Sequence, residues 1–281
     1  MIIAIPVEAK PGERRVALVP RDVAMLAGEG HEVRVQSGAG HGSGFSDNDY
    51  RAAGACIADR AGTWESDLIV KVKELQPDEL SHVRRGQAVF GFHHWIGHPG
   101  HARHAVATGL TAIAYEAVRD AQGGFPLLAP MSIIAGRMAI DVAAQHLGHS
   151  PARVLVLGAG HAGQAAAGAA RKSGAEVHVL RRATSTAQAI EQHALQSDLV
   201  VGAVFTAGER TPKLLPRALV TRMKRGAMIV DISIDAGGVA ETSRPTTHED
   251  PVFECEGVLH YAVANMPAAV PREASEALSA A

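Results

Sequence analysis

The sequence has few of the residues that mark disulfide-rich, metal-binding or membrane proteins. It contains only two cysteines, Cys56 and Cys255, which are far apart and outside any C-x-x-C spacing. Neither a disulfide framework nor a thiolate metal site is therefore indicated. The first apolar run spans only about six residues before charges begin, which is too short for a signal sequence or a membrane span. These features predict a cytoplasmic protein without a membrane partner.

An excess of charge of one sign is also missing. The formal net charge of the 281 residues is −2, so we expect no nucleic-acid partner. Hydrophobic residues make up 47% and charged residues 20%, which is ordinary for a globular enzyme. The length exceeds that of a usual single compact domain and predicts two domains of roughly 130 residues.

Short apolar runs alternate with amphipathic stretches along the chain, a pattern typical of βα units around a parallel sheet. Strands are predicted at 2–7, 32–36, 68–72, 88–92, 111–115, 198–204, 227–232 and 258–261. Helices are predicted at 20–28, 46–53, 100–108, 131–147 and near 216–223. We expect an α/β fold of two Rossmann-like, doubly wound parallel-sheet domains with the cleft between them. Residues 1–128 plus 267–281 would form the substrate domain, and residues 129–266 the dinucleotide-binding domain.

The stretch from Val154 to Thr184 has the pattern of a dinucleotide-binding βαβ unit. A G-x-G-x-x-G motif follows an apolar run and opens a helix rich in small residues. Gly158 would make the tight turn, Gly160 would let the backbone approach a pyrophosphate, and Gly163 would let the helix pack close to the strand. The pyrophosphate would lie at the helix N-terminus. The remaining motif residues, also expected to contact the cofactor, are Ala159, His161 and Ala162.

The second strand of this unit ends in Arg181 and Arg182. An NAD site would place an acidic residue there for the ribose 2′-hydroxyl, whereas arginine accommodates a 2′-phosphate. The pair therefore favours NADP(H) over NAD(H). Because NADPH is a reductant, it also favours a biosynthetic, imine-reducing role.

Polar residues collect where predicted strands of the first domain end, the edge at which open α/β sheets bind ligands. Arg15 follows the first strand, Lys73 the third, and His93 and His94 the fourth. Taken singly, each is more often a solvated or strand-edge residue than a site residue. Their convergence on one edge of one sheet favours a site. Lys71, one step further from the strand end, is interpreted as structural.

Several stretches together resemble the alanine dehydrogenase and pyridine nucleotide transhydrogenase family, from the first residues to about Pro271. They are IPVEAKPGERRVALVP, DLIVKVKE, GQAVFGFHH, AIAYEAV, PLLAPMSIIAGRMA, VLGAGHAG, DLVVGAV, VDISIDAGG and the segment from SRPTTHEDPVFE to YAVANMPAAVP. The resemblance implies an oxidoreductase that reduces the imine formed from a 2-oxo acid, such as pyruvate, and an amine. It also implies a homo-oligomer acting reversibly on small-molecule substrates.

Carried over by position, the resemblance gives each residue a role. Arg15 and Lys73 would bind the carboxylate and the carbonyl oxygen of the oxo acid, and His94 would be the general acid and base. Asp235 would position the ammonia or the departing water, and Asn265 would contact substrate and nicotinamide. The other residues that match cofactor contacts are Ser132, Ala203, Val204, Ile232 and Met266.

Two questions stay open at this point: which amine reacts with the oxo acid, and whether the chain is an active enzyme. An additional arginine in PGERRV, Arg14, resembles the N5-(carboxyethyl)ornithine synthase branch, which joins pyruvate to the amine of an amino acid with NADPH. Trp95 and Ile133, which would border the pocket, set its volume rather than its chemistry. A non-catalytic nucleotide-binding module is the alternative of another class, and the joint presence of the four catalytic-type residues argues against it.

Five histidines between positions 93 and 104 raise the possibility of a metal site. They are His93, His94, His98, His101 and His104. A proline and a glycine interrupt the set, and no carboxylate or cysteine joins it. We therefore expect no metal, with His94 catalytic, His93 lining the cleft and the others solvated.

Overall fold

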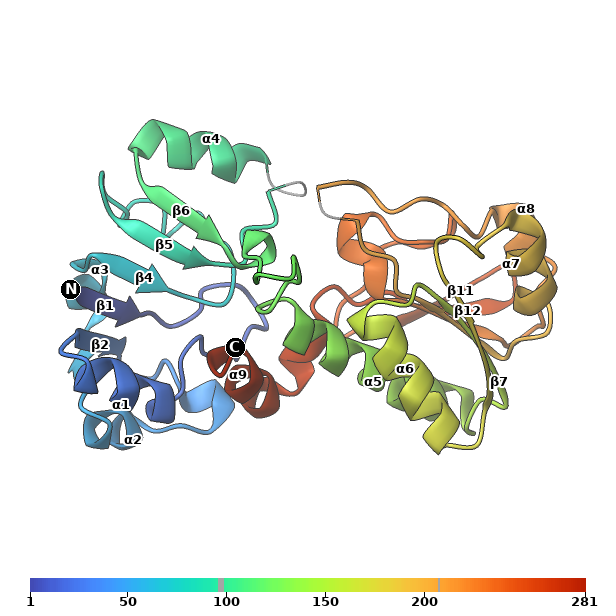
Figure 1. Cartoon of the computed structure of the whole chain (residues 1–281), viewed down its shortest axis with the longest axis horizontal. Helices are drawn as coiled ribbons and strands as arrows, with labels where there is room; N and C mark the ends of the chain where they lie inside the picture. The colour runs from blue at the N-terminus through green and yellow to red at the C-terminus, as the bar shows by residue number, and fades with distance from the viewer. Residues whose placement is uncertain (96–98, 207) are drawn as a thin grey trace. The chain divides into compact units, whose positions relative to one another are not determined.

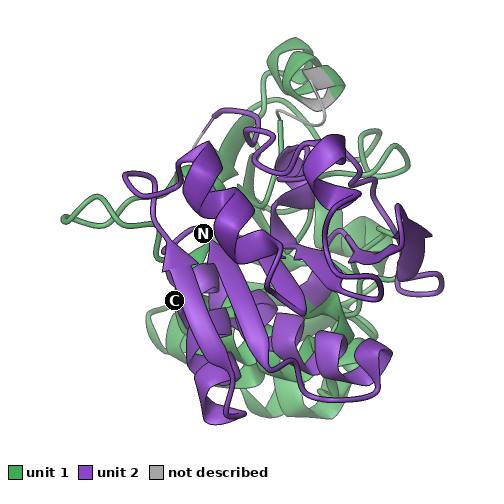
Figure 2. Cartoon of the chain, turned by 90° about the vertical axis from the view of Figure 1, so that its right-hand side faces the viewer, with its two compact units in different colours: residues 1–131, 267–281 green, residues 132–266 purple. Residues whose placement is uncertain are grey.

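The computed structural model describes residues 1–95, 99–206 and 208–281, with the side chains of residues 99 and 101 left out (Figure 1). The chain forms two compact units. Unit 1 comprises Met1–Met131 with Pro267–Ala281, and unit 2 comprises Ser132–Met266 (Figure 2). The domain boundaries expected from the sequence, residues 1–128 with 267–281 and residues 129–266, remain a prediction.

Unit 1 is built on a six-stranded, entirely parallel sheet with the order β3-β2-β1-β4-β5-β6. Its strands are β1 (Ile2–Ile5), β2 (Glu32–Gln36), β3 (Cys56–Ala58), β4 (Leu68–Val70), β5 (Ala88–Gly91) and β6 (Thr111–Ala114). Its helices are α1 (Pro20–Gly28), α2 (Asp47–Ala52), α3 (Arg60–Trp64), α4 (Pro99–Thr108) and α9 (Pro271–Ser279), with short 3-10 turns η1 (His41–Ser43) and η2 (Tyr115–Ala117). The strand order reverses at β1, which pairs with β2 on one side and β4 on the other.

Alternate residues of each strand in unit 1 pack on opposite faces of the sheet. Ile5 belongs to an apolar cluster that also contains Val33 and Val35, whereas its neighbour Ala4 packs with Ile69 and Val89. Because both faces are covered, the strands read as nearly continuous apolar runs. Each fully buried valine or isoleucine contributes roughly 1.5–3 kcal/mol to the core.

The C-terminal helix α9 completes unit 1 although it lies far away in sequence. The backbone N–H of Val16 donates to Ser275 Oγ at 2.9 Å, and that of Val19 donates to Ser279 Oγ at 3.0 Å. Ser43 Oγ lies 2.8 Å from Ser275 Oγ. The red helix therefore lies beside the blue N-terminal segment in Figure 1. These contacts tie down the loop that carries Arg15.

Unit 2 has a six-stranded sheet with the order β11-β12-β10-β9-β7-β8. Its strands are β7 (Arg153–Leu157), β8 (Glu176–Leu180), β9 (Leu199–Gly202), β10 (Met228–Asp231), β11 (Val252–Cys255) and β12 (Val258–Tyr261). Its helices are α6 (His161–Lys172), α7 (Ala187–Ala194) and α8 (Arg217–Val220), with 3-10 turns η3 (Ile232–Ala236) and η4 (Met266–Ala269), the latter running on into unit 1. The long helix α5 (Ala129–Leu147) begins in unit 1 and continues into unit 2.

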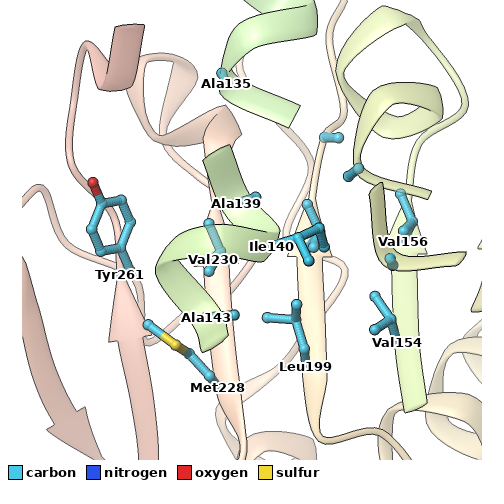
Figure 3. Close-up of a cluster of buried hydrophobic side chains, with 14 of the residues drawn as sticks. Ala135, Ala139, Ile140, Ala143, Val154, Val156, Leu199, Met228, Val230 and Tyr261 are labelled. Atoms are coloured by element: carbon cyan, nitrogen blue, oxygen red, sulfur yellow. The ribbon is translucent and has the colours of Figure 1, made fainter. Parts of the chain in front are cut away.

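Helix α5 covers one face of the unit 2 sheet. Ala139, Ile140 and Ala143 of this helix pack against Leu199 and Val230, two of the strand residues drawn in Figure 3. The small alanines let the helix approach the sheet closely. The opposite face has its own cluster, formed by Leu155, Leu157 and Ile229 with residues of α7 and α8.

The predicted fold class is confirmed, with one difference in the second sheet. Strand β11 pairs antiparallel with β12, so this edge of the sheet is a hairpin. Glu256 and Gly257 join the two strands with positive φ angles of 56° and 76°, a tight turn that supports antiparallel pairing. The segments that the sequence left unassigned are β3, β11, α3, α7 and α9. No helix within the described ranges is long and apolar enough to cross a membrane.

Candidate functional site

The candidate substrate residues of unit 1 follow three neighbouring parallel strands. Arg15 lies in the loop after β1, Lys73 comes three residues after the end of β4, and His94 comes three residues after the end of β5. The carboxyl ends of parallel strands meet at one edge of the sheet, where ligands bind in folds of this kind. The reversal of strand order at β1 marks the same place.

Lys73 and His94 are brought together. The Nζ atom of Lys73 lies 3.3 Å from Nε2 of His94, and Lys73 is only 5% exposed. With the ammonium charged, Nε2 of a neutral imidazole is the acceptor in this contact. The His94 ring stacks on Phe92, with ring centroids 5.6 Å apart and an interplanar angle of 13°. The pair presents a cation beside a group able to transfer a proton.

Arg15 is held by an acidic neighbour. Its Nε and Nη2 atoms donate to the two carboxylate oxygens of Glu13 at 2.7 and 2.6 Å, and its backbone N–H donates to Glu13 at 3.0 Å. Nη1 lies 3.1 Å from the sulfur of Met131. The guanidinium is 2% exposed. This fork-to-fork pairing fixes the guanidinium plane, as recognition of a substrate carboxylate requires.

Lys71 has the structural environment expected for it. Its side chain is fully buried, and Nζ lies 2.9 Å from Glu79 and 3.3 Å from Glu8. Burial lowers the pKa of Lys71, but the two carboxylates outweigh this effect, so the pKa of Lys71 lies above its ordinary value. Lys71 therefore stays charged, and its role is to anchor the segment that carries Lys73.

The histidine cluster divides into residues with separate environments. His93 does not line an open site, because it is 4% exposed and its Nε2 lies 3.4 Å from the carbonyl oxygen of Val89. Burial lowers the pKa of His93 and keeps it neutral. His98 lies outside the described residues, as does the side chain of His101. Among the residues with described side chains, no group of three potential ligands is placed to hold a metal ion.

The glycine loop of unit 2 has the geometry of a phosphate-binding turn. Gly158 has a φ of 109°, and a Cβ there would lie 2.2 Å from the carbonyl oxygen of Ala203. A Cβ on Gly163 would lie 2.0 Å from the carbonyl oxygen of Gly158, so α6 packs directly on the loop. A Cβ on Gly160 meets nothing within 4 Å. Gly158 and Gly163 allow close packing, and the open space at Gly160 suits a pyrophosphate.

The N-terminus of α6 adds to this fit. No side chain caps it at Gly160, so the first N–H groups of the helix, in His161 and Ala162, are available to an anion. A sequence signal was missed beside it: a Cβ on Gly136 of α5 would lie 2.1 Å from the carbonyl oxygen of Ala162. Gly136 thus lets the long helix pack on the start of α6.

Arg181 and Arg182 follow β8 and are both exposed. Within the described part of the chain, neither guanidinium has an ion-pair or hydrogen-bond partner. The backbone of Arg181 is fixed, because its N–H donates to Thr184 Oγ1 at 2.9 Å and its carbonyl accepts from Ser185 Oγ at 2.9 Å. The turn therefore presents two arginines at the position where a ribose 2′-substituent lies in such folds.

Two loops at the carboxyl edge of the unit 2 sheet are joined by Ser233. Its Oγ accepts from the N–H of Val204 and donates to the carbonyl of the same residue, both at 2.9 Å. Asp235 is exposed on η3. The ammonium of Lys213 donates to the carbonyl oxygens of Gly237, Gly238 and Ala240 and fixes the end of this turn.

The remaining predicted cofactor residues have varied environments. Asn265 is half-buried with a φ of 71°, and its carbonyl lies 3.3 Å from His248 Nε2. Met266 is 3% exposed and belongs to the apolar core of unit 2. Ile232 packs against the same core. Ser132 lies near the start of α5, half-buried, and the neighbouring Ile133 is exposed, as is Trp95 after β5.

Sequence reasoning missed the glutamates that hold the unit 1 residues in place. Glu8 accepts from the N–H of Lys73, Glu13 binds Arg15, and Glu116 accepts from the N–H of His94. All three lie inside the family-like stretches already quoted. The only signal in the sequence was an acidic residue in the loop after a predicted strand. Solvated surface glutamates occur at such positions too, so the signal did not single these three out.

Comparison with known families covers nearly the whole chain. Residues 4–135 match the family described as "Alanine dehydrogenase/PNT, N-terminal domain". Residues 134–281 match "Alanine dehydrogenase/PNT, C-terminal domain". The alanine dehydrogenase of Halomonas elongata is 43% identical over 314 residues, an alignment that covers 99% of this chain and 85% of the relative.

Solved structures give the same result. A structure titled L-alanine dehydrogenase is 36% identical, superposes with a TM-score of 0.91, and covers 100% of this chain and 87% of its own. A transhydrogenase from Sinorhizobium meliloti is 27% identical with a TM-score of 0.89, covering 99% of this chain and 91% of its own. Both similarities extend through the two units.

Proposed function

Because the chain belongs to the alanine dehydrogenase/PNT family, we propose that it interconverts alanine with pyruvate and ammonia using NADP(H). It is an oxidoreductase that acts on CH–NH2 groups with a nicotinamide nucleotide. The observation that carries the proposed chemistry is the 3.3 Å contact between Lys73 and His94. In the reductive direction, ammonia condenses with the oxo acid, water leaves, and the resulting imine is reduced.

The proposed roles are those that the family resemblance gives to these positions, and the chemistry of the side chains suits them. Arg15, with its plane fixed by Glu13, binds the substrate carboxylate, while the ammonium of Lys73 polarises the carbonyl. His94 gives a proton to the departing hydroxyl and takes one up in the reverse direction. The carboxylate of Asp235 orients the amine, and Asn265 contacts substrate and nicotinamide. When bound, the nicotinamide supplies or accepts the hydride equivalent that the side chains cannot provide.

The cofactor would be held by the loop and helix start around Gly160, where the open space and uncapped amides suit a pyrophosphate. Backbone contacts from the Ala203–Val204 and Ile232 segments, together with Ser132 and Met266, complete the proposed binding set. The preference for NADPH is supported by Arg181 and Arg182, which are exposed and lack an acidic partner in the described chain. A cytoplasmic homo-oligomer is part of the same proposal.

The first experiment is steady-state turnover of pyruvate with ammonia, following absorbance of each reduced cofactor. We expect kcat/KM to be higher with NADPH than with NADH. Arg181→Asp should reverse this preference by at least about tenfold, since it removes a phosphate ligand and adds an acceptor for a 2′-hydroxyl. A wild-type enzyme that prefers NADH would contradict the cofactor proposal, and an enzyme without turnover would contradict the activity.

The identity of the amine is tested in the same assay. Replacing ammonia with a series of amino acids would reveal joining of pyruvate to a second amino acid, the reaction suggested by Arg14. We expect ammonia to give the highest kcat/KM. His94→Ala should abolish turnover while leaving cofactor binding intact. A variant with nearly full turnover would remove His94 from the mechanism.

A further inference from the structure

The three candidate substrate residues of unit 1 share one structural feature. Each donates its own backbone N–H to a glutamate side chain that comes from a different position in the chain. The pairs are Arg15 with Glu13 at 3.0 Å, Lys73 with Glu8 at 3.2 Å, and His94 with Glu116 at 2.6 Å. The contact at His94 is the shortest, and it lies at a backbone that needs support.

His94 has a φ of 47°, which lies in the left-handed region that L-residues other than glycine rarely adopt. Such a conformation persists only when its surroundings hold it. Glu116 supplies the hold, because the N–H groups of both His93 and His94 point at its carboxylate. The N–H of His93 lies 3.2 and 3.3 Å from the two oxygens. Two successive amides directed at one anion form a nest of the kind that binds carboxylates.

The element that carries Glu116 also supports the ring of His94. Glu116 lies in η2, directly after β6, and its neighbour Tyr115 is buried. The Tyr115 ring meets Phe92 edge to face, with centroids 5.1 Å apart and an interplanar angle of 88°. Phe92 in turn stacks on His94. Two neighbouring residues of η2 thus support His94: Glu116 binds its backbone directly, and Tyr115 supports its ring through Phe92.

We infer that Glu116 is a positioning residue, whose carboxylate holds His94 in the left-handed conformation that directs its Nε2 to Lys73. The inference rests on the proposed function, because it assumes that His94 transfers the proton. Glu116 itself does not touch the reacting atoms. Its removal should therefore reduce the rate of the chemical step through His94 and leave substrate binding by Arg15 in place.

Glu116→Ala is the first variant, assayed for turnover of pyruvate and ammonia with saturating reduced cofactor. We expect kcat to fall by at least about tenfold, the order of effect of a misplaced catalytic group, and the KM for pyruvate to change by less than about threefold. In a His94→Ala background, assayed at high enzyme concentration for residual turnover, the same substitution should cause no further loss, since the two residues act through one group. An equal loss in both backgrounds would refute the inference.

Two conservative variants separate positioning from folding. Glu116→Gln keeps the length of the side chain and one acceptor oxygen. Glu116→Asp keeps the negative charge, but its side chain is one methylene shorter and reaches less far toward the amides of His93 and His94. We expect Glu116→Gln to retain more of the kcat than Glu116→Asp. The reverse order would mean that charge rather than reach matters, and the positioning role would be wrong.

Gln87→Ala is the matched control at the opposite end of β5. Gln87 is 2% exposed and donates to the carbonyl oxygens of Trp64 and Ser66, so its loss lowers stability without touching His94. Its kcat should stay at the wild-type value. A fall in kcat equal to that of Glu116→Ala would assign the effect to lost stability. If His94→Ala alone leaves turnover intact, the proposed role of His94 fails, and a wild type without turnover of pyruvate and ammonia would contradict the proposed function instead.

Discussion

Arg15 is buried together with a negative partner, and this pairing sets the direction of the guanidinium plane. Glu13 accepts from Nε and Nη2, and the sulfur of Met131 lies 3.1 Å from Nη1. A lysine here would pair with Glu13 as a point charge and lose the planar second contact. Residue identity therefore matters more than charge at this position.

Arg15→Lys should raise the KM for pyruvate by roughly ten- to a hundredfold, because one bidentate contact to the carboxylate is lost. The effect on kcat should be smaller, since the proton-transfer pair Lys73–His94 is untouched. Steady-state kinetics with pyruvate as the varied substrate measures both constants. An unchanged KM would show that the carboxylate is bound elsewhere.

Helix α6 can reach the loop before it only because Gly163 has no side chain. The added Cβ would lie 2.0 Å from a backbone oxygen, which cannot move without displacing the turn at Gly158. Gly168 is in the same helix, and a Cβ there meets nothing within 4 Å. One helix thus contains a glycine required by packing and one that packing does not require.

Gly163→Ala should weaken binding of the reduced cofactor by at least about tenfold, since α6 must move away from the loop that holds the pyrophosphate. Gly168→Ala should leave the Kd unchanged and stabilise the helix by up to about 1 kcal/mol. Fluorescence titration gives the Kd and thermal melting gives the stability. Equal Kd values for the two variants would count against a pyrophosphate at this loop.

Elements with strong apolar periodicity were predictable from the sequence, and short or partly polar ones were not. The helix at 20–28 and the strands at 32–36 and 258–261 agree with the observed bounds, because they are bounded by proline, glycine or charge. Strand β3 has only three residues, Cys56–Ala58, and none is fully buried. Its pairing with β2 is a tertiary effect that no local pattern reveals.

The same limit applies to the candidate site. The glycine spacing and the strand-end positions of Lys73 and His94 could be found in the sequence, since chemistry demands those residue types there. The interior position of His93 could not be found in the sequence, because it depends on the direction that the chain takes after β5 ends at Gly91. The left-handed backbone of His94 is likewise invisible in sequence, because a contact with a distant residue, Glu116, supports it.

Buried neutral histidines connect the stability of the whole molecule to pH. His260 is 1% exposed, with Nε2 2.7 Å from Thr242 Oγ1 and Nδ1 3.0 Å from the carbonyl oxygen of Val258. Burial lowers the pKa of His260 below its ordinary value of 6.5. As the pH falls through 6.5, the unfolded chain binds a proton that the folded chain does not. Stability present above this pH is therefore lost on acidification.

His260→Gln should reduce the loss of thermal stability between pH 7.5 and pH 5, although the variant is less stable at neutral pH. His93, whose pKa is lowered in the same way, keeps part of the dependence in place. His149→Gln, at an exposed position, is the control and should melt like the wild type at every pH. Parallel pH profiles for His260→Gln and wild type would contradict the linkage.

The return of the chain to unit 1 after unit 2 has a consequence for synthesis on the ribosome. The loop that carries Arg15 relies on serines of α9, which are translated only after every residue of unit 2. Unit 2 is continuous and has all its strands before then, so it can fold as soon as it emerges. Unit 1 thus begins before unit 2 but is completed after it, and its β1 loop stays without these partners until residues 267–281 leave the ribosome.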